Sequence, residues 1–230
     1  MMWLSANESE ALSISLSVAA RSVALSLPIA IVLAWVLTRR QFIGRTLLDA
    51  LVHLPLVLPP VVVGYLLLLL FGTRGPIGAW LAHVFGIELI FTRNGAALAT
   101  AVMSFPLMVR AMRISLENVD RGLEDAARTL GAGAIDRFTS VTLPLMLPGV
   151  LAGAITAFSA ALGEFGAVIT FVSNIPGETR TLPLALYTAL QTPGGDHAAA
   201  RLALISISLG FGGLLLSEWF ARRVRRLLGR

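Results

Sequence analysis

Long stretches without a charged residue are separated by short charged segments along the whole chain. Five of these stretches reach or approach the roughly 20 residues that a membrane-spanning helix needs. Their residues are apolar all round, whereas a helix on a solvated core shows an apolar stripe of period 3.6. The pattern predicts an all-α membrane protein with about five transmembrane helices. We expect the spans at roughly residues 15–38, 48–72, 94–114, 146–172 and 200–220.

The composition also indicates an integral membrane protein. Hydrophobic residues make up 56% of the chain, charged residues make up 13%, and the mean hydropathy is +0.81. We therefore predict a single transmembrane domain over residues 1–230, surrounded by membrane lipid.

The arginines predict the orientation, because short loops rich in basic residues stay on the cytoplasmic side. With five spans, three arginine clusters lie on one face of the membrane. We therefore expect the N-terminus outside, the C-terminus in the cytoplasm, a cytoplasmic loop at 115–145 and an external loop at 173–199. The three clusters comprise Arg39, Arg40 and Arg45, then Arg110, Arg113, Arg121, Arg128 and Arg137, and finally Arg222, Arg223, Arg225, Arg226 and Arg230.

An apolar segment at residues 181–195 bears on the number of spans. The segment is short for a crossing, and a sixth span would move the C-terminal arginines to the outside. We therefore expect it to form an interfacial or re-entrant helix within the external loop.

Several kinds of chemistry are excluded by residues that the chain lacks. It has no cysteine and no lysine, and its three histidines lie far apart in the sequence. We therefore expect no disulfide, no metal site and no catalytic residue. A P-loop of the form GxxxxGK[ST] needs its lysine, so this chain cannot hydrolyse a nucleotide by that route. The net charge of +5 does not indicate nucleic acid, because the arginines follow the membrane topology.

The predicted cytoplasmic loop contains a short amphipathic helix. Asp120 can cap a helix over 121–130, and Gly131 stands where a left-handed C-terminal cap is expected. The spacing i, i+3, i+4, i+7 places Leu123, Ala126, Ala127 and Leu130 on one apolar stripe. By spacing alone, this stripe either packs against the membrane domain or binds another protein. A second short helix is expected over 134–141, ended by Leu143 and Pro144.

The same loop resembles the EAA loop of ABC-importer permeases, whose pattern is E-A-A, three residues, G, nine residues, I-x-L-P. Asp125 replaces the glutamate and Val141 replaces the isoleucine. The resemblance implies that the loop forms coupling helices in a groove of an ATP-hydrolysing subunit. The candidate coupling residues are Glu124, Asp125, Ala126, Ala127, Leu130, Gly131, Val141, Leu143 and Pro144.

The resemblance extends along almost the whole chain and is strongest to the molybdate permease branch. It is carried by residues 53–65 (HLPLVLPPVVVGY), 103–110 (MSFPLMVR), 162–170 (LGEFGAVIT) and 171–192 (FVSNIPGETRTLPLALYTALQT). Sulfate and thiosulfate permeases share weaker versions of these segments, and the sequence does not rank molybdate against tungstate. The resemblance implies alternating access in the cytoplasmic (inner) membrane of a prokaryote.

The resemblance also implies the composition of the complex. Two copies of this chain would assemble with two cytoplasmic ATPase subunits and a periplasmic or extracellular oxyanion-binding protein. ATP and Mg²⁺ would be bound by the ATPase, and this chain would hold no cofactor. The competing class is a self-contained secondary transporter or channel, which would need no ATPase.

Two groups of residues are candidates for the translocation path. Glu164 is the only acidic residue deep inside a predicted span, so it must face the bundle interior, a partner or water. It is either a path or gate residue or a structural bond to a neighbour, and Gly163 and Gly166 beside it allow close helix contact. Pro59 and Pro60 bend the second span, either as a moving kink or as a static one.

The external loop contains candidates for contact with a binding protein. Asn174, Glu178 and Arg180 lie before the apolar segment at 181–195. They either receive the binding protein or form an ordinary solvated connection.

Overall fold

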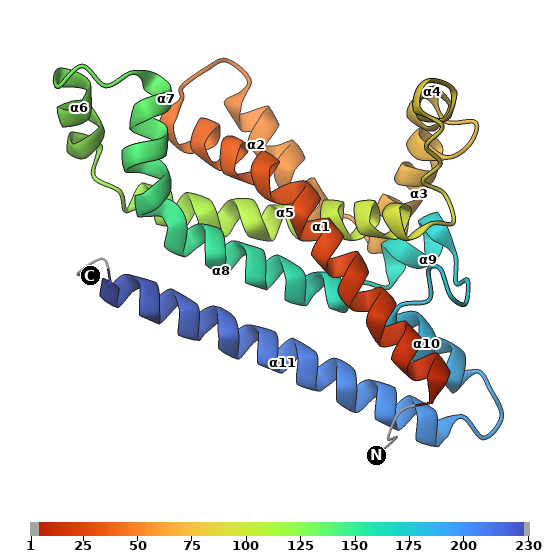
Figure 1. Ribbon diagram of the computed structural model, residues 1–230. Coiled ribbons are helices and arrows are strands. Elements are labelled where there is room, and N and C mark those ends of the chain that lie inside the picture. Colours follow the sequence, from red (N-terminus) through yellow and green to blue (C-terminus); the bar gives the residue numbers. More distant parts are fainter. Residues whose placement is uncertain (1–4, 228–230) are drawn as a thin grey trace.

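The regular structure is entirely helical in the computed structural model, which describes residues 5–227. Figure 1 shows the arrangement of these helices. In chain order they are α1 (Ala6–Arg39), α2 (Arg45–His53), η1 (Leu54–Leu56), α3 (Pro60–Phe71), α4 (Pro76–Phe85), α5 (Arg93–Glu117), α6 (Arg121–Thr129), α7 (Ala134–Arg137), η2 (Phe138–Thr142), α8 (Leu143–Leu162), α9 (Gly166–Val172), α10 (Leu182–Leu190) and α11 (Asp196–Leu227).

Four helical stretches within the described residues are long and apolar enough to cross a membrane. They are α1, α5, the continuous stretch from α7 to α8 (Ala134–Leu162), and α11. The pair formed by Arg45–Leu56 and Pro60–Phe71 makes a fifth span if its two parts are counted together. The predicted fold class, all-α with about five transmembrane helices, is confirmed.

Two of the expected spans are broken. Within residues 48–72, α2 with η1 and α3 meet at 113°, because Pro59 and Pro60 lack the N–H groups that would continue the helix. Within residues 146–172, α8 ends at Leu162 and α9 begins at Gly166. The first break lies where Pro59 and Pro60 were expected to bend the second span. The second differs from the continuous helix expected from hydropathy, which does not register where backbone hydrogen bonds are lost.

The helical layer is held together by the packing of α5 between α1 and α8, and α11 lies along α8 (Figure 1). Met108, Met112 and Met146 are fully buried in the core between these helices. Two glycines on α8 allow the backbones to approach. A Cβ on Gly149 would stand 2.3 Å from the Ser115 Cβ, and one on Gly153 would stand 3.0 Å from the Met108 carbonyl oxygen. Their GxxxG spacing is the signal for this contact.

The helix expected over 134–141 does not end at Pro144. The chain passes from α7 through η2, which is a π-helix, directly into α8, and Pro144 lies in the first turn of α8. Proline in a continuing helix clashes with the carbonyl of residue i−4, and the wider π turn accommodates this. The expected end of that helix is therefore wrong.

The apolar segment at 181–195 forms α10, which has nine residues. It packs against α11 and α1, and Leu182 and Leu184 are fully buried. The segment is thus too short to cross a bilayer. Figure 1 places α10 at the end of the bundle opposite to α6.

Candidate functional site

The short helix α6 is formed by the local sequence as expected. Asp120 caps its start, since one carboxylate oxygen accepts a hydrogen bond from the Gly122 amide at 2.8 Å. At its end, the Gly131 amide donates to the Arg128 carbonyl and the Ala132 amide donates to the Ala127 carbonyl, both at 3.0 Å. This pair of bonds is a Schellman motif, and Gly131 has the left-handed φ of +89° that the motif requires.

The predicted stripe of α6 is largely open to its surroundings. Leu123 is 47% exposed, Leu130 is 88% exposed and Ala126 is also exposed, whereas Ala127 is half-buried. Asp125 forms an exposed ion pair with Arg128 at 3.7 Å. In Figure 1, α6 stands at one end of the bundle, beyond the long helices. The stripe as a whole therefore does not pack against the membrane domain of its own chain, which was one of the two alternatives from spacing.

Glu124 lies on a different side of α6 from the exposed leucines and contacts the bundle. Its carboxylate oxygen Oε1 accepts hydrogen bonds from Arg39 Nε at 3.2 Å and from Thr142 Oγ1 at 2.9 Å. Arg39 comes from the end of α1 and Thr142 from η2. In the sequence, Arg39 bears only on membrane orientation, because no local pattern connects residues 85 positions apart.

The last three candidate coupling residues lie where the loop joins the bundle. Val141 is in η2, and Leu143 and Pro144 are in the first turn of α8. Leu143 packs against the core that contains Met112. These residues therefore connect the segment after α6 to a span.

The candidate path residues of the two broken spans come together. A Cβ on Gly166 would stand 2.7 Å from the Pro60 Cβ, so the start of α9 lies directly against the start of α3. Pro59 immediately precedes α3. Glu164 is half-buried at the second break, and its carboxylate accepts a hydrogen bond from the Ala167 amide at 2.9 Å. Gly163, the C-cap of α8, is exposed.

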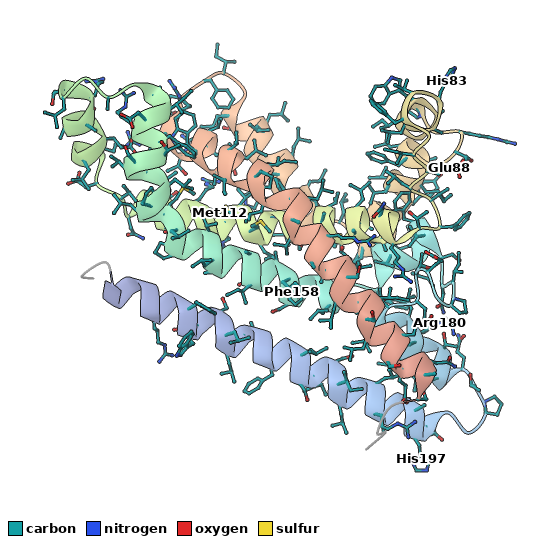
Figure 2. All side chains as sticks on the ribbon, in the orientation of Figure 1. His83, Glu88, Met112, Phe158, Arg180 and His197 are labelled. Atoms are coloured by element: carbon teal, nitrogen blue, oxygen red, sulfur yellow. The ribbon has the colours of Figure 1, made fainter. Side chains whose placement is uncertain are left out.

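The candidates in the external loop mostly bond to one another and to their neighbours. The Asn174 side-chain amide donates to Thr188 Oγ1 at 2.8 Å and accepts from Arg180 Nε at 3.0 Å. Glu178 is more open, with a side chain that is 57% exposed and 3.8 Å from Arg93 Nε. Figure 2 shows Arg180 near the end of the bundle where α10 lies.

No group of three or more metal-ligating side chains is present among residues 5–227. Figure 2 shows two of the histidines, His83 on α4 and His197 at the start of α11, in separate parts of the molecule. The Asp49 carboxylate accepts a hydrogen bond from Arg113 Nη1 at 2.5 Å, and His53 Nδ1 lies 2.9 Å from the Asp49 carbonyl oxygen.

Comparison with protein families identifies the kind of molecule to which this geometry belongs. The family described as "Binding-protein-dependent transport system inner membrane component" matches residues 26–226. The chain belongs to this family of ABC-importer permeases. It is therefore a multi-pass inner-membrane permease and is not itself the ATPase. Membership of this family sets aside the alternative of a self-contained secondary transporter or channel.

Two curated relatives and one solved structure extend the comparison. The molybdenum transport system permease protein ModB of Escherichia coli (strain K12) is 58% identical, with both chains covered completely. The sulfate transport system permease protein CysT of the same strain is 41% identical over 84% of this chain and 71% of its own. A bacterial alginate ABC transporter, solved with an alginate-bound periplasmic protein, matches 96% of this chain and 81% of its own with a TM-score of 0.75. At 17% identity that structure supports the fold alone.

Proposed function

We propose that this chain is the membrane-spanning permease of an ATP-driven importer of molybdate. The permease moves molybdate across the cytoplasmic membrane by alternating access. The observation that carries this proposal is the 58% identity over the full length to a molybdenum permease. The sulfate permease is less similar and is matched over only part of its length. Tungstate is the other substrate that this likeness allows, because its oxyanion closely resembles molybdate.

We infer a complex of two permease chains, two cytoplasmic ATPase subunits and an external oxyanion-binding protein. The chain has no P-loop lysine, so ATP and Mg²⁺ belong to the ATPase and this chain holds no cofactor. A pathway between two copies related by a two-fold axis is the economical arrangement for about five helices. The external protein has candidate contacts at Asn174, Glu178 and Arg180, of which Glu178 is the most open.

The ATPase is proposed to bind the exposed side of α6. Leu123, Ala126 and Leu130 form an apolar surface on a helix that otherwise carries charges, and the alanine allows another surface to approach closely. No residue of α6 is buried within the chain. This exposed stripe, next to the EAA-like residues from Glu124 to Gly131, supports docking to a separate protein.

The gate is proposed to lie where the two broken spans meet. Irregular backbone at membrane depth is tolerated where it is buried in protein or lines a water-filled cavity, and discontinuous helices form the substrate sites of several transporters. The breaks at Pro59 and Pro60 and at Gly163, Glu164 and Gly166 adjoin one another. They provide a hinge for opening and closing.

Transport by the reconstituted complex tests this function. The chain, its ATPase and its binding protein would be placed in proteoliposomes, and uptake of labelled molybdate would be followed with and without ATP. We expect ATP-dependent uptake of molybdate that unlabelled tungstate inhibits and an equal concentration of sulfate does not. A preference for sulfate would overturn the substrate, and uphill uptake by this chain alone would overturn the mechanism.

A further inference from the structure

Arg39, Glu124 and Thr142 form a cluster that we call the clamp. Arg39 Nε donates to Glu124 Oε1 at 3.2 Å, and its Nη2 donates to the Val119 carbonyl at 3.0 Å. Thr142 Oγ1 donates to the same Glu124 oxygen at 2.9 Å. The Arg39 side chain is 8% exposed and that of Glu124 is 21% exposed. Charged hydrogen bonds that are shielded from water in this way are stronger than exposed ion pairs.

The clamp connects three elements that are distant in the sequence. Arg39 is the last residue of α1, Glu124 is on α6, and Thr142 is the last residue of η2, directly before α8. Arg121 of α6 also reaches α1, because its Nη2 donates to the Thr38 carbonyl at 3.5 Å, and α6 packs against the segment from α7 to η2. One carboxylate oxygen on α6 is thus attached at the same time to the end of α1 and to the residue directly before α8.

The two sides of α6 have different surroundings. Leu123, Ala126 and Leu130 are exposed, whereas Glu124 and Ala127, which are three residues apart, are the partly buried positions. Beside the clamp, a polar cavity of about 480 Å³ is lined by residues that include Arg39, Glu117 and Arg121. The connection from α5 to α6 borders this pocket and is held to α1 by the bond from Arg39 to the buried Val119.

We propose that Glu124 is a positioning residue that transmits displacement of α6 to α1 and α8 through Arg39 and Thr142. This inference depends on the proposed docking of the ATPase on the exposed side of α6. A force applied to the exposed stripe reaches the bundle through the clamp, through the longer Arg121–Thr38 bond and through the contacts with α7 and η2. Of these, the clamp joins α6 to α1 and η2 at the same time through one shielded carboxylate. Without the carboxylate, α6 still binds the ATPase but moves without carrying α1 and α8 with it.

The number of molybdate ions imported per ATP hydrolysed tests the clamp in the reconstituted complex. For Glu124→Gln we expect the ATPase to copurify and hydrolyse ATP as with the unchanged chain. Glutamine keeps an acceptor oxygen but removes the counter-charge of the shielded Arg39 guanidinium, and the uptake per ATP should therefore fall about tenfold. Asp136→Asn is the matched control, since it removes an exposed carboxylate from α7 in the same loop and should leave the ratio unchanged.

Exchange of the two charges provides a second variant. Arg39→Glu and Glu124→Arg should each lower the uptake per ATP, and the double variant should recover part of it, because the ion pair is restored whereas the bonds to Thr142 and Val119 are not. An unchanged ratio in Glu124→Gln, or no recovery in the double variant, would overturn the transmission role.

The proposed docking surface is tested separately by Ala126→Arg, which should prevent copurification of the ATPase. Retention of the ATPase by Ala126→Arg would overturn the docking on which the clamp proposal depends. If Glu124→Gln also lost the ATPase, Glu124 would be part of the docking surface and the clamp would not be the transmitting contact.

Discussion

At the scale of single residues, Glu164 shows how a carboxylate is accommodated at membrane depth. Its carboxylate oxygen accepts a hydrogen bond from the Ala167 amide. This amide is one of the N–H groups at the start of α9 that have no acceptor within the helix. Glu164 therefore stabilises the start of α9 after the break at Gly163. The bond found here is a local helix cap within the chain, formed three residues along the sequence.

Two substitutions of Glu164 should distinguish its role as a helix cap from any role of its negative charge in transport. Glu164→Ala removes the acceptor, and we expect it to cost about 1 kcal/mol, the typical loss of a helix cap. The thermal unfolding midpoint of the purified protein should fall by about 2–4 °C. Glu164→Gln keeps an acceptor oxygen and should retain most of this stability and most of the molybdate uptake. A stable Gln variant without uptake would show that the negative charge itself acts in the pathway.

At the scale of elements, α6 is bounded by signals within its own few residues. Asp120 satisfies an amide at the start, and the left-handed Gly131 completes the Schellman motif at the end. Gly133, two residues later, has a φ of −66°. A Cβ at either glycine would meet no atom within 4 Å, so the two positions differ in backbone conformation and not in space.

This difference predicts that alanine is tolerated at Gly133 and not at Gly131. Gly131→Ala places a side chain in the left-handed region and should destabilise the end of α6 by about 1 kcal/mol. Hydrogen exchange followed by mass spectrometry should show faster exchange of the amides in the last turn of α6. Gly133→Ala is the control and should leave this exchange as it is. Equal exchange in the two variants would contradict the role of the left-handed cap.

At the scale of the whole molecule, the long helices link two functional ends. One end carries α6, and the other carries α10 and the Glu8–Arg201 ion pair at 2.8 Å, which joins the start of α1 to α11 (Figure 1). On α3, the face away from α9 exposes Leu66 and Leu69. If the gate lies at the breaks beside α3, this apolar face meets the second protomer in the proposed pair.

Cysteine cross-linking tests that arrangement directly, because the chain has no native cysteine. Leu69 is 50% exposed on α3, and Ile207 is 66% exposed on α11, which packs along α8. We expect Leu69→Cys to form disulfide-linked dimers on mild oxidation in membranes and Ile207→Cys to remain monomeric in denaturing gels. The reverse pattern would place α11, and not α3, between the protomers.

The sequence by itself determined the features that depend on local physics. Long uninterrupted apolar segments indicate a bilayer, because their side chains are poorly accommodated in water. A helix is the form that such a segment takes in lipid, since it satisfies its own backbone hydrogen bonds. The caps of α6 also follow from adjacent residues, because a carboxylate or a glycine acts on amides only a few positions away. The EAA-like pattern and the missing P-loop lysine indicated an ABC permease before any contact was known.

Only the tertiary structure decided which distant residues meet. Arg39 is one of many arginines that orientation explains equally well, and its pairing with Glu124 depends on how α1 and α6 approach in space. The contact between Pro60 and Gly166 likewise joins two separate breaks, neither of which hydropathy detects. Side-chain partners across a bundle are set by helix packing and tilt, and these depend on the shapes of all the interfaces at once.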